Sequence, residues 1–307
     1  MFEEFAIDPA LIVQWEYFDK LRGQFGFDKG RLIADFPHKG WKKAVAGLLL
    51  ANQNSSNPVR NYSTIAAWLS CNDGMRDHRL ARAKRPYDQN KRWVLNAEDQ
   101  APSFHAVLSH DKLDAQNLIQ VTETTCLSDE PLFSIETQPR ISRTNEGLIE
   151  IAKPLLQCAS KIKWVDRYFD PQDAGNIGPF EYMLQWIGQT FAERPLTIEL
   201  HVERRDSFSE ATKRNYLLAL RPLTSASVQL TVFFWKPGTE NLHPRFLLTD
   251  VGGLQYDYGL DEGRHNLETT IVVLQSPSRW KDEWQRYSHE TTDLDMDPTQ
   301  HVLQIAQ

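Results

Sequence analysis

The side chains best suited to chemistry lie in one short segment, His243-Pro244-Arg245, which four residues separate from Asp250. Together with Asp250 it supplies a potential nucleophile (His243), a permanent cation (Arg245) and a carboxylate (Asp250). In an extended strand successive side chains alternate between faces, so His243 and Arg245 point the same way and can converge on one small anion. These residue types are those that bind and attack a phosphate group.

The flanking sequence predicts that this segment belongs to a sheet. An apolar run, 228–235, precedes it, and the pair Gly252-Gly253 and a second apolar run, 270–274, follow. Asp250 stands where the apolar part of the motif segment ends. This order indicates strand, turn, strand with the motif, turn and strand.

Upstream of these runs, helical and strand patterns alternate. Such alternation predicts a mostly parallel sheet with helices on both faces. The expected elements are a helix over 146–160 that Pro154 kinks, a strand over 161–165 that ends in a polar loop, a helix over 179–191, a strand over 196–202 and a helix over 209–220.

The spacing His-x-(Lys/Arg)-x4-Asp, after this order of elements, resembles the phospholipase D superfamily over about residues 146–287. The similarity is closest to single-repeat members and to the phospholipase D-like domain at the C-terminus of certain MIT-domain proteins. Three features depart from the family pattern. Arg245 stands where the family nearly always has Lys, Pro244 removes a backbone donor from the strand, and Gly252-Gly253 offers the only tight turn where a Gly-Ser pair is usual.

The resemblance implies a metal-independent phosphodiesterase without a cofactor that acts through a phosphohistidine. His243 would attack phosphorus, Arg245 would hold the non-bridging oxygens, and Asp250 would orient a histidine. The substrate would lie near the turn at Gly252 and Gly253. A second histidine must protonate the leaving oxygen, and single-repeat members obtain it by forming a homodimer.

Other positions have a chemical and a structural interpretation. His110-Asp111-Lys112, with Asn117 at the Asp position, is either an internal second half-site or a chance match in a polar loop. Asp166 and Asp170 follow a strand and are either site residues or loop caps. We expect structural roles for four further residues. His201 would be a packed strand residue, and the core anchors of a last helix would be Trp280, Trp284 and Tyr287.

Basic residues gather between residues 76 and 92, where Tyr87 and Trp93 accompany them. Such a cluster could hold a nucleic-acid backbone, and the arginines selected for this role are Arg79, Arg82 and Arg85. The alternative is a solvated surface.

Composition limits the remaining choices. The 307 residues are 41% hydrophobic, no apolar run reaches membrane-spanning length, and the net charge is -7. The three cysteines, Cys71, Cys126 and Cys158, have neither disulfide nor metal spacing, which favours a reducing, cytoplasmic compartment.

The sequence therefore predicts an α/β protein in three parts. A mainly helical domain with the basic patch covers 1–145, a phospholipase D-like mixed sheet flanked by helices covers 146–290, and an acidic tail covers 291–307. We expect a nuclease that binds nucleic acid as a homodimer, with room for a partner subunit, in a setting such as bacterial antiviral defence or restriction. The alternative is a catalytically silent module of the same fold that binds a protein partner or an anionic lipid.

Overall fold

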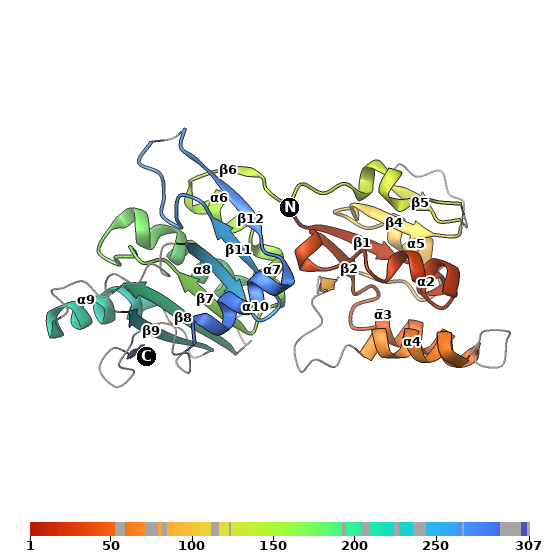
Figure 1. The fold of residues 1–307 in the computed structure, drawn as a ribbon, viewed down its shortest axis with the longest axis horizontal. Helices are drawn as coiled ribbons and strands as arrows, with labels where there is room; N and C mark the ends of the chain where they lie inside the picture. Colours follow the sequence, from red (N-terminus) through yellow and green to blue (C-terminus); the bar gives the residue numbers. More distant parts are fainter. Residues whose placement is uncertain are drawn as a thin grey trace. The chain divides into compact units, whose positions relative to one another are not determined.

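The computed structural model divides the chain into two compact units, residues 1–136 and 137–307. The structure describes residues 1–52, 59–70, 79–81, 85–111, 117–122, 124–191, 195–203, 209–223, 227–235, 244–265, 267–288 and 302–305. Each unit is built around its own sheet (Figure 1).

The N-terminal unit holds a five-stranded parallel sheet with the order β3-β2-β1-β4-β5. Because β1 is central, both faces of this strand are covered. Its buried residues are Phe5, Ala6 and Ile7. The strands are β1 (Glu3–Ile7), β2 (Arg31–Ala34), β3 (Leu80–Ala81), β4 (Ala106–Ser109) and β5 (Leu118–Gln120).

Helices cover both faces of this sheet. Phe5 and Ile7 pack in one apolar cluster with α1 to α4, whereas Ala6 packs in another with α5. The helices are α1 (Pro9–Ile12), α2 (Trp15–Leu21), α3 (Trp41–Ala51), α4 (Val59–Ser70) and α5 (Trp93–Glu98), and short 3-10 turns lie at η1 (Phe27–Lys29), η2 (Leu127–Asp129) and η3 (Pro131–Phe133).

The mainly helical architecture expected for residues 1–145 needs correction, because a parallel sheet forms the centre of this unit. Its strands have only two to five residues each. Strands buried on both faces lack the apolar and polar alternation that marks a half-exposed strand. Periodicity alone does not distinguish such short apolar runs from segments of buried helix.

The C-terminal unit holds an eight-stranded mixed sheet with the order β13-β9-β8-β7-β10-β11-β12-β6. β7, β8 and β9 are parallel, and the other strands pair antiparallel. The strands are β6 (Arg140–Ser142), β7 (Lys161–Val165), β8 (Leu196–Glu203), β9 (Val228–Trp235), β10 (Arg245–Thr249), β11 (Gly252–Tyr256), β12 (Thr269–Leu274) and β13 (Val302–Ile305). The strands predicted between residues 161 and 274 are confirmed.

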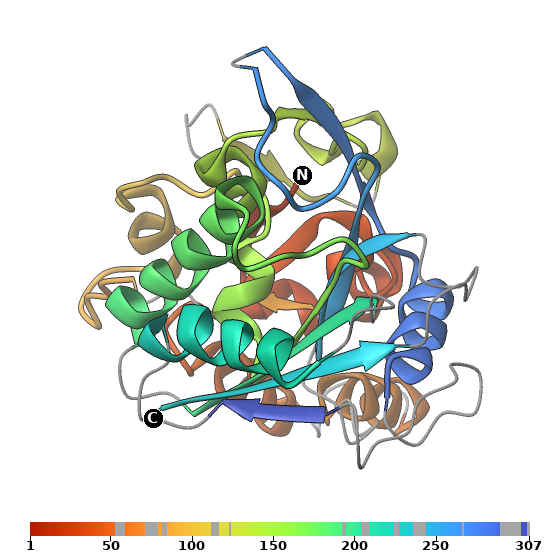
Figure 2. The same ribbon diagram turned by 90° about the vertical axis from the view of Figure 1, so that its left-hand side faces the viewer.

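Helices also lie on both sides of this sheet: α6 (Asn145–Glu150), α7 (Lys153–Cys158), α8 (Ala174–Phe191), α9 (Glu210–Leu220), followed by η4 (Arg221–Leu223), and α10 (Pro277–Arg286). Figure 2 shows α8 and α9 on one side and α10 on the other. Trp164 packs on Phe180 of α8, whereas Trp280 and Tyr287 pack with Phe246 and its neighbours on the opposite face. The role of core anchors expected for Trp280 and Tyr287 is confirmed.

The division between the units lies at Glu136, inside the Pro-containing segment that follows residue 130. β6 therefore joins the second sheet although it precedes the predicted boundary at residue 145, and β13 lies within the predicted tail. The helix expected over 146–160 is broken at Ile151 and Ala152 into α6 and α7, since Pro154 cannot donate the backbone hydrogen bond of a continuous helix.

No helix in the described ranges is both long and apolar enough to cross a membrane.

Close packing at Gly253 gives a stability prediction. A Cβ there would lie 2.7 Å from Leu248 Cδ2 and 3.2 Å from Trp280 Cδ1, so Gly253→Ala should lower the free energy of unfolding by about 1–3 kcal/mol. Gly188, in α8, has no atom within 4 Å of such a Cβ, so Gly188→Ala should raise it by about 0.5–1 kcal/mol. Urea denaturation of the full chain measures both, and equal stability of the two variants would contradict the packing.

Candidate functional site

The position of β10 decides which motif residues can act together. β10 lies between β7 and β11, antiparallel to both, and Phe246 pairs with Val165. Arg245 therefore lies beside Asp166, at the edge of the sheet where the parallel strands β7 and β8 end. Ligands of α/β sheets commonly bind at this edge. We call the group Asp166, Tyr168, Arg245, Tyr258 and Gly259 the Arg245 edge.

The Arg245 guanidinium is a cation to which the described residues give no hydrogen bond. Its Nε is buried, and the described part of the chain offers it neither a hydrogen bond nor an ion pair. The guanidinium carbon lies 5.2 Å from the centre of the Tyr168 ring. A Cβ on Gly259 would lie 3.7 Å from Nε, and the φ of +116° also favours glycine there. The open donors of Arg245 can therefore accept an anion from outside.

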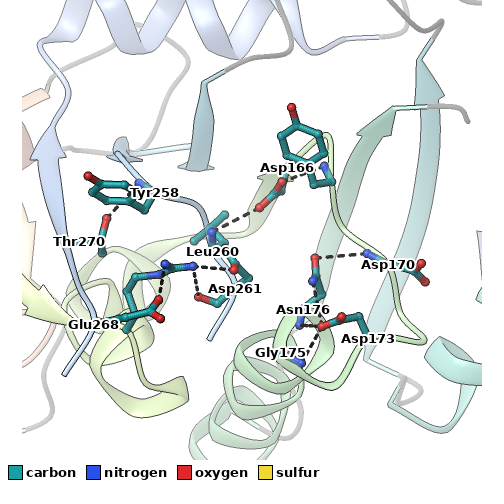
Figure 3. Close-up of polar contacts among 12 residues, drawn as sticks. Asp166, Asp170, Asp173, Gly175, Asn176, Tyr258, Leu260, Asp261, Glu268 and Thr270 are labelled. Carbon is teal, nitrogen blue, oxygen red and sulfur yellow. Dashed lines mark hydrogen bonds and ion pairs between the residues drawn. The ribbon is translucent and has the colours of Figure 1, made fainter. Parts of the chain in front are cut away.

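Asp166 fixes the loops of this edge. Its Oδ1 accepts a hydrogen bond from the Tyr168 amide (3.0 Å), and its Oδ2 accepts one from the Leu260 amide (3.3 Å), as Figure 3 shows for Leu260. Burial raises the pKa of Asp166, and the amides and the charge of Arg245 oppose this shift only in part. Asp166 thus caps its loop, and its carboxylate also faces the cation.

The neighbouring arginines are already paired. Arg143 binds Asp261 (2.6 Å) and Glu268 (2.9 Å), and Arg167 Nε donates to Glu203 (2.6 Å). These pairs neutralise the charges around Arg245.

The loop after β7 continues into the start of α8. The Asp170 amide donates to Asn176 (3.4 Å), and Asp173 accepts from the amides of Gly175 and Asn176 (Figure 3). The hydrogen bonds from Asn176 lower the pKa of Asp173. The loop-cap interpretation therefore describes Asp170, whose Oδ1 accepts from the Gln172 amide (3.0 Å), and Asp173 has the same role at the start of α8.

Asp250 and the glycine pair lie at the opposite end of β10. Five residue steps along an extended strand cover about 16 Å, so Asp250 is far from Arg245. Its Oδ1 accepts from the Ser160 amide (2.8 Å), and its Oδ2 accepts from the Ser160 hydroxyl. The turn predicted at Gly252 and Gly253 needs correction: both residues begin β11 at this same end and pair with Thr249 and Leu248, and the turn itself is formed by residues 250 and 251. The structure therefore does not bring these three residues to Arg245. His243 lies outside the described residues.

Two arginines of the basic patch, Arg79 and Arg85, are largely internal. Arg79 is 5% exposed, donates to the Trp68 carbonyl (2.7 Å) and lies 4.0 Å from the Trp68 ring. Arg85 pairs with Glu4 and lies 4.1 Å from the Phe104 ring. Arg82 lies outside the described residues. The expected backbone contacts of Arg79 and Arg85 need correction, because both guanidinium groups are used within the N-terminal unit.

The polar residues after β4 also belong to the N-terminal unit. His110 Nε2 lies 2.9 Å from Gln14 Nε2, and the His110 ring packs on Tyr17. Asp111 pairs with Arg92. Nearby, Asp8 follows β1 and accepts from the Ser109 hydroxyl (3.1 Å), and burial raises its pKa.

Two residues of the His110-Asp111-Lys112 match remain to be placed, Lys112 and Asn117. Asp8 is a further residue of this region. Lys112 lies outside the described residues, and Asn117 donates to the Phe104 carbonyl (3.0 Å). Asp8 was not predicted as a site residue, although its position directly after the apolar run Phe5-Ala6-Ile7 is a signal for the end of a strand.

His201 is a core residue, as predicted. Its ring stacks between Phe233 (4.9 Å) and Trp235 (5.6 Å) on strand β9. Trp235 Nε1 donates to Nδ1 (3.1 Å), which leaves Nε2 to donate to Glu199 (3.3 Å). Burial lowers the pKa of His201 to about 4. Lys163, also in contact with Glu199, donates to the carbonyl groups of Trp284 (2.9 Å) and Tyr287 (2.5 Å).

In the part of the chain that the structure describes, no group of three His, Cys, Asp or Glu side chains is placed to hold a metal ion.

Comparisons with known proteins give no relative: no family model matches the chain, and no curated protein matches it. The resemblance to phospholipase D therefore depends on the motif residues and on the order of the elements.

The buried contacts of Arg79 predict an effect on stability. Arg79→Ala removes the hydrogen bond to Trp68 and the contact with its ring, and it should lower the free energy of unfolding by about 1–3 kcal/mol. The matched control is Lys91→Ala, whose exposed pair with Asp99 should leave the denaturation midpoint unchanged. A fully stable Arg79→Ala protein with weakened nucleic-acid binding would restore the surface-patch interpretation.

The buried His201 predicts a pH dependence. Its pKa falls from 6.5 to about 4 on folding, so the unfolded chain binds more protons between these values. The free energy of unfolding should therefore decrease as the pH is lowered through this range, by up to about 1.4 kcal/mol per pH unit. Urea titrations of the wild type and of His201→Gln measure this slope. The variant should lose it, and an unchanged slope would mean that other groups, such as Glu199, cause it.

Proposed function

We propose that the C-terminal unit binds a phosphodiester of a nucleic acid at the Arg245 edge. The observation that carries the proposal is the Arg245 guanidinium, whose Nε is buried and which has no hydrogen-bond partner in the described residues. No carboxylate in the described residues forms an ion pair with this guanidinium, so a phosphate would not have to displace one.

Phosphate suits this cation better than a single carboxylate does. A guanidinium presents its N–H groups as a planar fork that matches two phosphate oxygens, and the interaction is stronger away from water. Arg143 and Arg167 have the same chemistry, but carboxylates already form ion pairs with both, through Nη1 and Nη2 of Arg143 and through Nε of Arg167. Arg245 is thus the arginine of this edge that supports an external anion.

Cleavage of the bound phosphodiester is the catalytic form of the proposal. It rests on the resemblance to phospholipase D, together with the position of His243 two residues before Arg245. His243 would form a bond to phosphorus while the leaving oxygen takes a proton, and water would then hydrolyse the phosphohistidine. The second histidine for proton transfer would come from a second copy of the chain.

A silent binding module is the second candidate, and one observation favours it. Ser160 holds Asp250 at the end of β10 opposite Arg245, so the motif carboxylate is not beside the proposed phosphate. A module of this kind needs Arg245 for a phosphate ligand but does not need His243 for hydrolysis.

A nuclease assay in EDTA tests the catalytic form. Purified full-length protein and 5′-labelled DNA and RNA oligonucleotides should give cleavage without added metal, and His243→Ala should reduce the rate at least about 10³-fold because the nucleophile is absent. Arg245→Gln should weaken binding about tenfold or more, since it removes a charged hydrogen-bond donor.

The outcomes separate the two candidates. Binding that needs Arg245 without any cleavage supports the silent module. Cleavage that requires magnesium, or that His243→Ala retains, contradicts the phosphohistidine mechanism. Binding that is equal in the wild type and in Arg245→Gln contradicts the proposed function itself.

A further inference from the structure

Two exposed tyrosines lie beside the unpaired arginine. Tyr168 is 52% exposed and Tyr258 is 60% exposed, although aromatic rings of this size usually bury most of their surface. Tyr258 immediately precedes Gly259, whose position for a Cβ is 3.7 Å from Arg245 Nε, and the Tyr168 ring is 5.2 Å from the same guanidinium. The cation therefore has an accessible aromatic residue on each of two loops.

Hydrogen bonds hold the backbone of both tyrosines. The Tyr168 amide donates to Asp166 Oδ1 (3.0 Å), and the Tyr258 amide donates to the Thr270 hydroxyl (3.2 Å). Figure 3 shows Tyr258 beside Thr270, with Leu260 of the same loop reaching Asp166. The Arg143 guanidinium also lies 6.0 Å from the Tyr258 ring. These hydrogen bonds fix the backbone from which the rings extend, which reduces the entropy lost when a ligand binds.

The charges of this edge argue against a duplex ligand. A protein that binds double-stranded nucleic acid gains affinity from many phosphate contacts and the release of counterions. Among the residues that the structure describes, Arg143 and Arg167 are paired with Asp261, Glu268 and Glu203, so these two arginines are not free to hold a backbone. A ligand must obtain the rest of its affinity elsewhere, and stacking on exposed rings supplies it when bases are unpaired.

We propose that the ligand of the Arg245 edge is a single-stranded nucleic acid, with a phosphate on Arg245 and bases stacked on Tyr168 and Tyr258. This inference rests on the proposed function, because Arg245 must hold the phosphate. A duplex buries the faces of its bases within the helix, so it cannot use the two tyrosines.

Fluorescence anisotropy with the full-length chain tests this inference. Probes are a labelled eight-nucleotide DNA strand, the same strand with abasic sites, and a hairpin duplex, all in the His243→Ala protein so that no strand is cleaved. Tyr168→Ala and Tyr258→Ala should each weaken binding of the base-bearing strand about tenfold, the loss expected from one base stack, and leave the abasic strand unaffected. The hairpin should bind more weakly than the single strand.

Matched variants control for the loss of the tyrosine hydroxyl groups and for the removal of an exposed side chain elsewhere. Tyr168→Phe and Tyr258→Phe keep the ring and should bind within about twofold of the parent protein. Leu50→Ala removes an exposed side chain of the other unit (59% exposed) and should change nothing. Thermal denaturation checks that every variant is folded.

Each result has a distinct meaning. Arg245→Gln should weaken the base-bearing and abasic strands alike, and its failure to do so overturns the proposed function. If the Tyr→Ala variants weaken both strands equally, the tyrosines only position Arg245 and the stacking inference is overturned. Hairpin binding as tight as single-strand binding also overturns it. Absence of binding to all three probes overturns both proposals.

Discussion

The antiparallel placement of β10 between β7 and β11 is the constraint on which the rest of the C-terminal unit depends. It sets Arg245 beside Asp166 at the edge where β7 ends, and it sets Asp250 beside Ser160 at the other edge. The motif that looks compact in the sequence therefore serves two purposes in space. One end carries the cation Arg245, and the other end closes a turn.

Asp166 lies at the end of β10 that carries Arg245, and its hydrogen bonds stabilise the loops there. A buried carboxylate needs donors and a nearby positive charge, and it obtains two amide donors from different loops together with the field of Arg245. The same contacts fix the two loops that carry Tyr168 and Tyr258. Asp166 thus connects the two loops that carry the tyrosines and lies beside the cation.

Sequence patterns predicted the C-terminal sheet well because its strands are long apolar runs, such as Val228–Trp235, separated by clear turns. They did not predict the N-terminal sheet, whose short strands are buried on both faces. The sequence also did not show which side chains contact one another. Trp68 and Phe104 lie 11 and 19 residues from the arginines that they contact, so nothing local shows that Arg79 and Arg85 are internal. Asp250 was assigned to chemistry by the resemblance to the family motif, although five residue steps along an extended strand already separate it from Arg245 by about 16 Å.

The last described strand has a consequence for association between molecules. β9 has eight residues, six of them buried, and β13 pairs with it along Leu230 to Phe233. Without this pairing, the backbone N–H and C=O groups of an apolar strand could form hydrogen bonds with any other extended chain. The opposite border of the sheet is β6, with only three residues, one of them the exposed Arg140. Both borders thus discourage the edge-to-edge pairing that begins aggregation.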